Sequence, residues 1–243
     1  MNRHPGVTAV LVRRMAGFLV PMVSMYWAIM TIVYLGVTGA IAVFDTVEQS
    51  MWHNIAGPPP RYWLLSMGIV TVVQARTYVA LGVTRRQLGE AYLVLYTLMA
   101  LLFATVYAVG FAPEHAAYAA GGLLDRLAEP YPIAGPGDVI RIFTGAILAN
   151  LAHLVAGALI GIGFYRYGVW GGLLIIPVAA LPAVAVEAAF GAQWAGQGLN
   201  HLLGLPVAPL PVGLAISAGI LTILVAGTYR VYRTMPVRPA STR

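Results

Sequence analysis

The sequence has no cysteine, no lysine and few charged residues of either sign. Without cysteine, the chain has neither disulfide bonds nor thiolate metal ligands. Without lysine, it lacks both the phosphate-binding residue of a Walker A loop and the amine that forms Schiff bases. If the protein uses the energy of a nucleotide, a partner therefore has to bind that nucleotide.

The scarcity of charge also indicates the class of protein. Only 9% of the 243 residues are charged and 60% are hydrophobic, whereas a soluble domain has about 25% charged residues. The expected solvent is therefore a lipid bilayer. The net charge of +6 comes from arginines scattered between apolar segments, which indicates membrane topology rather than nucleic-acid binding.

Six apolar segments are each long enough for a membrane helix, which needs about 20 residues. They are residues 17–44, 62–79, 88–110, 139–164, 169–190 and 207–229. Their continuous apolar character, without the alternation of strands, favours helices. The sequence predicts an all-α integral membrane protein with six transmembrane helices in a single domain. The first segment is longer than the about 7–15 apolar residues of a signal peptide, so we expect it to be retained.

The arginines predict the orientation, because cytoplasmic loops are enriched in basic residues. With both termini in the cytoplasm, only Arg61, Arg126 and Arg141 of the arginines fall on the outer side. Most of the acidic residues, in contrast, fall on that side. Residues 1–16 then form a cytoplasmic amphipathic segment and residues 230–243 a basic cytoplasmic tail.

The predicted connections differ in length. The inner ones, residues 80–87 and 165–167, are tight. Of the outer ones, we expect a short interfacial helix at residues 116–127 and a re-entrant or interfacial segment at residues 191–205.

A compact polar phrase, "LGVTRRQLGE", occupies residues 81–90 between the second and third predicted helices. Gly82 and Gly89 flank a predicted short turn of helix, and Thr84 is suited to cap its start. Arg85 and Arg86 are expected to face water or lipid phosphate. Two interpretations stay open: the arginine pair fixes the topology, or the phrase is a docking surface.

The longer stretch "LGVTRRQLGEAYLV" resembles the loop between the second and third membrane helices of ABC-2-type transporter permeases, especially the compact actinobacterial type. The residue-level match covers residues 81–90, and the six-helix layout is similar over the whole chain. The resemblance implies a coupling helix that docks on a separate ATPase subunit. It also implies an N-terminal connecting helix, for which residues 7–15 are the candidate. The residues implied to face the ATPase are Gly82, Val83, Thr84, Arg85, Arg86, Gln87 and Glu90.

The resemblance implies the permease subunit of an ABC exporter in the cell membrane. Such a subunit is not an enzyme: ATP and Mg would be bound by the ATPase partner, beside a second permease subunit, identical or different. The apolar pathway suits an amphipathic or hydrophobic substrate, such as a drug-like molecule, a peptide or a lipid. The alternatives are a gradient-driven secondary transporter or channel and, with no reaction template to support it, a membrane enzyme.

Polar residues within predicted membrane helices are candidates for a transport pathway or gate. They are Gln74, Arg76, Asn150, His153 and Glu187. Arg76 either snorkels to the inner surface or belongs to an inner gate. Asn150 and His153 share a helix face, where they either make packing hydrogen bonds or line a cavity. Glu187 either snorkels outward, pairs with His153 or meets a second subunit. These groups are too few for a metal site.

The sequence "GALIG" at residues 157–161 places two glycines four positions apart. This spacing predicts close helix packing, either within the chain or across a dimer.

Overall fold

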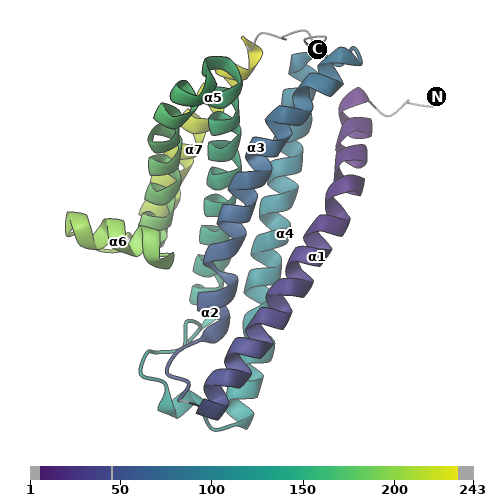
Figure 1. Cartoon of the computed structure of the whole chain (residues 1–243). Helices are drawn as coiled ribbons and strands as arrows, with labels where there is room; N and C mark the ends of the chain where they lie inside the picture. The colour runs from purple at the N-terminus through teal and green to yellow at the C-terminus, as the bar shows by residue number, and fades with distance from the viewer. Residues whose placement is uncertain (1–5, 45, 235–243) are drawn as a thin grey trace.

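A computed structural model describes residues 6–44 and 46–234, and this part of the chain is helical without any strand (Figure 1). Its elements are α1 (Val7–Phe44), α2 (Met51–Ala56), α3 (Pro58–Ala80), α4 (Arg85–Ala120), the 3-10 helix η1 (Leu124–Arg126), α5 (Pro136–Phe190), α6 (Gln193–Leu203) and α7 (Leu210–Arg233). Among the described residues, α1, the α2–α3 stretch, α4, α5 and α7 are long and apolar enough to cross a membrane. The chain is therefore an all-helical, multi-pass membrane protein.

The longest helix, α5, is bent back on itself at Gly168. The backbone there has φ 72° and ψ −164°, a region that glycine occupies without a steric penalty. The second arm of α5 ends beside the beginning of the first arm, because a Cβ atom added to Gly145 would lie 3.0 Å from the ring of Phe190. Residues 139–164 and 169–190, expected as separate helices, are thus the two arms of α5, which lie side by side in Figure 1.

The centre of the bundle is the crossing of α3 with the first arm of α5. Gly157 packs against the backbone of Leu65 and Gly161 against the backbone of Ile69, and Gly68 meets α5 in the same way. Small residues let two helix backbones approach this closely. The close packing predicted from residues 157–161 is confirmed, and the partner is α3 of the same chain.

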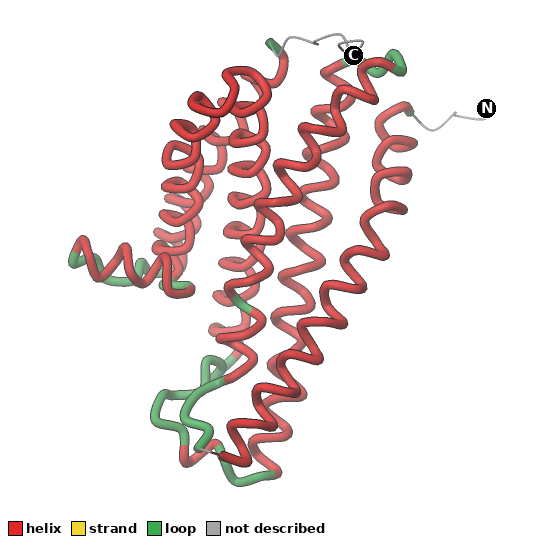
Figure 2. The backbone as a smooth tube through the Cα atoms, viewed as in Figure 1, coloured by secondary structure: helices red, strands yellow, loops and turns green. Residues whose placement is uncertain are grey.

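The two ends of the bundle differ. At one end, here called the turn end, lie the start of α1, the α3–α4 turn, the Gly168 bend and the end of α7. Hydrogen bonds join the last three of these parts: Arg85 Nη1 donates to the carbonyl of Arg233 at 3.0 Å, and Arg166 Nη1 donates to Thr234 Oγ1 at 2.8 Å. The opposite end, here called the loop end, carries α2, η1 and most of the loops (Figure 2).

Several predicted boundaries are wrong. Residues 7–15 do not form a helix of their own but continue into α1. Residues 116–127 contain the last turn of α4 and η1 rather than one interfacial helix, because Tyr118 is buried under the loop end and keeps α4 helical to Ala120. Residues 230–233 complete α7, and residues 235–243 of the expected tail lie outside the described residues.

The segment expected at residues 191–205 does contain a distinct helix, α6, which lies across the end of the second arm of α5 (Figure 1). Gly191 and Gly204 flank it with left-handed φ values of 63° and 62°. These glycines let the chain leave α5 and enter α7 at sharp angles.

Candidate functional site

The phrase at residues 81–90 forms a tight turn followed by the first turn of α4. Gly82 has φ 85°, and Thr84 is the N-cap. Thr84 Oγ1 accepts a hydrogen bond from the Gln87 amide at 3.3 Å, and Gln87 Oε1 accepts one from the Thr84 amide at 3.1 Å. This reciprocal capping box starts a helix at once. The expected separate helical turn is therefore wrong, because Arg85 to Glu90 belong to α4 itself.

The two arginines of this turn have different partners. Arg85 donates to the carbonyl of Arg233 in α7. Arg86 Nε lies 2.9 Å from Glu90 Oε1, and its side chain is 80% exposed. An exposed pair of this kind adds little to stability. Because both side chains are exposed, their charges are accessible to a partner.

The exposed residues here form what we call the turn surface. Its apolar tip is Leu81, which is 70% exposed. Val83, Arg85 and Gln87 are only partly exposed. The turn surface consists of Leu81, Gly82, Thr84, Arg86 and Glu90.

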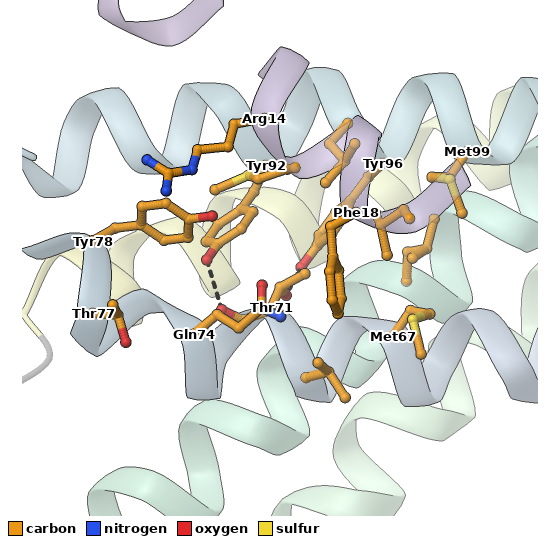
Figure 3. A pocket seen from close by; sticks show the side chains of 15 residues that line it. Arg14, Phe18, Met67, Thr71, Gln74, Thr77, Tyr78, Tyr92, Tyr96 and Met99 are labelled. Carbon is orange, nitrogen blue, oxygen red and sulfur yellow. Dashed lines mark hydrogen bonds between the residues drawn. The ribbon is translucent and has the colours of Figure 1, made fainter. Parts of the chain in front are cut away.

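A first cavity of about 350 Å³ lies between α1, α3 and α4 (Figure 3). In this view Arg14 and Tyr78 lie at one end of it, with Met67 and Met99 at the other. Gln74, a candidate pathway residue, is among the residues that line it. Arg76 is part of α3, but its side chain lies outside what the structure describes.

A second cavity, of about 570 Å³, lies between α3, α4, α5 and α7 and is lined mainly by apolar side chains. Thr71, Tyr92 and Tyr96 line both cavities. The Tyr92 hydroxyl donates to the carbonyl of Thr71 at 2.7 Å, and the Thr71 and Tyr96 hydroxyls are hydrogen-bonded. These three residues, here called the partition, separate the two cavities.

Asn150 and His153 line neither of these cavities. Asn150 Nδ2 makes a long hydrogen bond of 3.4 Å to the carbonyl of Ala100 in α4. His153 Nδ1 lies 2.8 Å from the carbonyl of Ala149 on its own helix. Of the two alternatives for Asn150, the structure favours a packing hydrogen bond between helices.

Glu187 belongs to a buried cluster of ionisable groups. Its Oε1 lies 2.7 Å from Arg61 Nη1 and 3.5 Å from His153 Nε2. The side chains of Arg61 and Glu187 are each only 3% exposed. Arg61, His153 and Glu187 are called the ion cluster below. The expected pairing of Glu187 with His153 is thus present.

Outward snorkelling of Glu187 is wrong, because α6 covers it. A Cβ atom added to Gly196 of α6 would lie 2.6 Å from the carbonyl carbon of Glu187. Ionisable groups held this deeply inside a membrane protein are expensive to bury and mark functional positions.

The sequence predicts Arg61 in an outer loop, whereas the structure places it in α3, paired with Glu187. The signal was present in "GPPPR". Proline favours the first helical turn, where its missing N–H is not needed, so the helix begins at Pro58. Arg61 is then inside the first turn of α3 and faces α5 instead of water.

A second buried carboxylate, Glu114, was expected in an outer loop and lies instead near the end of α4, 2% exposed. The Ser50 hydroxyl and the Trp52 amide each donate to it at 2.6 Å, and the Tyr131 hydroxyl donates at 3.1 Å. Burial, followed by the charge of Glu114, raises the pKa of Tyr131, so this phenol stays protonated and able to donate. Glu114 therefore holds the loop end together through neutral donors.

No group of three or more histidine, aspartate and glutamate side chains gathers to hold a metal ion within the described ranges, residues 6–44 and 46–234. Comparison of the chain with protein families, with curated proteins and with solved structures found no match.

Proposed function

We propose that the chain is the membrane-spanning permease subunit of an ATP-driven ABC exporter of the cell membrane, with six membrane passes. Each arm of α5, on either side of Gly168, exceeds the about 20 residues that one pass requires. The proposal rests chiefly on the continuity of the turn surface with α4.

The turn surface is built to transmit force. The capping box at Thr84 joins the turn to a helix that runs unbroken from Arg85 to Ala120, and Arg85 ties that helix to the end of α7. A displacement at Arg86 would therefore move α4 as a rigid body. Movements of this kind, in which packed helices shift against one another, are how domains switch between states.

The same helix reaches the cavities. Tyr92 and Tyr96 of α4 form the partition with Thr71 of α3. A shift of α4 would change the separation of the two cavities, which links ATPase docking to the pathway. The mainly apolar linings suit an amphipathic or hydrophobic substrate, such as a drug-like molecule, a peptide or a lipid.

The distribution of arginine supports a cytoplasmic turn end. Positive charge is enriched on the cytoplasmic side of membrane proteins. Arg61, Arg126 and Arg141 are at the loop end. The described arginines at the turn end are Arg13, Arg14, Arg85, Arg86, Arg166, Arg230 and Arg233. Both described ends of the chain then face the cytoplasm, where an ATPase subunit binds ATP and Mg and a second permease subunit completes the pathway.

The test is co-purification with an ATPase subunit encoded by a neighbouring reading frame. We expect Arg86→Glu to abolish co-purification and the stimulation of ATP hydrolysis, because it replaces the exposed cation of the turn surface with a second anion beside Glu90. Arg126→Glu, a matched change of an exposed arginine at the loop end, should leave both unchanged. Equal binding by both variants would refute the docking role.

A gradient-driven secondary transporter is the second candidate, and the ion cluster favours it. Such transporters place ionisable groups near the middle of the membrane to bind coupling ions. Substrate flux into vesicles that persists without ATP and stops when the proton gradient is collapsed would select this candidate over the exporter.

A further inference from the structure

The hydrogen bonding of His153 fixes where its ring carries a proton. Nδ1 lies 2.8 Å from the carbonyl oxygen of Ala149. A carbonyl oxygen only accepts hydrogen bonds, so Nδ1 has to be the donor. In a neutral imidazole the other nitrogen, Nε2, then presents a lone pair.

That lone pair points toward a carboxylate. Nε2 of His153 lies 3.5 Å from Oε1 of Glu187, so two acceptors face each other unless a proton lies between them. Glu187 Oε2 is buried and accepts no hydrogen bond from the described residues. Leaving a buried acceptor without a hydrogen bond is unfavourable.

We propose that Arg61, His153 and Glu187 form an internal proton-binding site, in which one proton is held between His153 Nε2 and Glu187. Without that proton the cluster contains a guanidinium, a carboxylate and a neutral imidazole, with a net charge of zero. When a proton arrives from the solution, His153 becomes an imidazolium that donates to Glu187, and the net charge is +1. No other bond changes, and the inference does not depend on which energy source drives transport.

The surrounding ionisable groups are few. From α3, the Tyr62 ring meets His153 edge-on, with ring centroids 6.2 Å apart. Toward the loop end, the charge of Arg61 also acts on His53 of α2, which in turn interacts with Glu129. The one ionisable side chain in the sequence of α6 is His201, which is exposed. Glu187 is therefore the carboxylate that faces the His153 ring.

The position of the site gives the proton a mechanical consequence. His153 is on the first arm of α5, Glu187 is on the second, and Arg61 begins α3. An imidazolium attracts Glu187 more strongly than a neutral ring does, so protonation draws the two arms of α5 together under α6. The protonation state of the site is thereby coupled to the packing of the two arms.

The test is nitrogen NMR of the full-length chain, labelled with ¹⁵N-histidine and held in lipid nanodiscs. The spectrum of His153→Gln identifies the His153 signals. At about pH 8 we expect the neutral Nδ1–H tautomer, and at about pH 5 an imidazolium with both nitrogens protonated. A wild-type His153 that keeps one neutral form across this range, or is neutral with its proton on Nε2, would overturn the proposal.

Two further variants separate the proposal from a loss of folding. Glu187→Gln should lower the imidazolium-to-neutral ratio of His153 about tenfold at a given pH, and Arg61→Gln should raise it about tenfold, because they remove charges of opposite sign. Unfolding would move both variants toward the same solvent-like behaviour. Equal ratios in two variants that both keep the folded thermal transition would contradict the proposed site. Neither outcome requires an ATPase, so the exporter proposal can fail independently.

Discussion

Two carboxylates are buried within residues 6–44 and 46–234, and their surroundings differ. Glu114 is enclosed at the loop end by the Ser50 hydroxyl, the Trp52 amide and the Tyr131 hydroxyl, all uncharged. Glu187 lies between Arg61 and His153 and keeps one oxygen without a hydrogen bond from the described residues. The first arrangement satisfies its carboxylate, whereas the second leaves it an unused hydrogen-bonding position.

This difference separates a structural role from a functional one. A carboxylate held by well-placed neutral donors fixes the segments that supply them, here α2, α4 and the loop before α5. A buried pair of opposite charges is weak evidence for stability, because the loss of hydration offsets much of the attraction. The ion cluster is therefore better explained by what it binds than by what it stabilises.

The largest effect is expected when one member of the ion cluster is removed. Arg61→Ala leaves Glu187 buried without its main counter-charge, which should lower the free energy of unfolding by about 3–5 kcal/mol. The measurement is the midpoint of thermal unfolding in detergent.

Replacing both charges is the matched control. The double variant Arg61→Leu with Glu187→Leu removes the pair instead of breaking it and should unfold close to the wild type, since such replacements are often neutral. If the double variant is as unstable as Arg61→Ala, the ion cluster is mainly a structural element.

A smaller effect is expected at Glu114. Glutamine at position 114 keeps one accepting oxygen, but its NH2 group faces the hydrogen-bond donors that surround the carboxylate. Glu114→Gln should therefore lower the free energy of unfolding by about 2 kcal/mol. The His153 signals should not move, because Glu114 is not part of the ion cluster. A shift of those signals would remove the distinction between the two carboxylates.

The cover of Glu187 can be tested with two glycines of α6. A Cβ atom at Gly196 would meet the backbone of Glu187, whereas one at Gly198 would meet nothing within 4 Å. We expect Gly196→Ala to destabilise the fold by about 1–3 kcal/mol through overpacking. We expect Gly198→Ala to stabilise it by about 0.5–1 kcal/mol, because alanine favours a helix. Thermal unfolding measures both, and equal effects would mean that α6 does not seal the ion cluster.

The smallest effect on stability is expected at the turn surface. Arg86→Ala removes an exposed pair with Glu90 and should leave the thermal midpoint unchanged. It should still weaken ATPase co-purification. Variants of the ion cluster that fold should co-purify with the ATPase as the wild type does. If Arg86→Ala lowers the thermal midpoint but binds the ATPase normally, the turn surface has a structural role and not a docking role.

The sequence predicts the local features of this molecule well. The apolar runs locate the long helices, the Thr84 to Gln87 spacing locates a cap, and the glycines at 157 and 161 locate a close packing face. Each of these depends on residues close together along the chain, where helix geometry fixes the arrangement.

The features that were missed depend on tertiary packing. Arg61 and Glu187 pair only because α5 bends back at Gly168 and its second arm returns beside α3. Glu114 appeared to be a loop residue because its donors Ser50 and Tyr131 come from distant segments. No local pattern specifies such pairings.

The most direct test of the central claim is the side of the membrane on which the turn surface lies. The chain has no cysteine, so Leu81→Cys introduces a single reactive site at an exposed position, and Asp125→Cys does so in η1. The account predicts that a membrane-impermeant thiol reagent labels Leu81→Cys only after the cells are permeabilised, and Asp125→Cys in intact cells. Labelling of Leu81→Cys in intact cells would place the turn surface beyond the reach of an ATPase and would contradict the account.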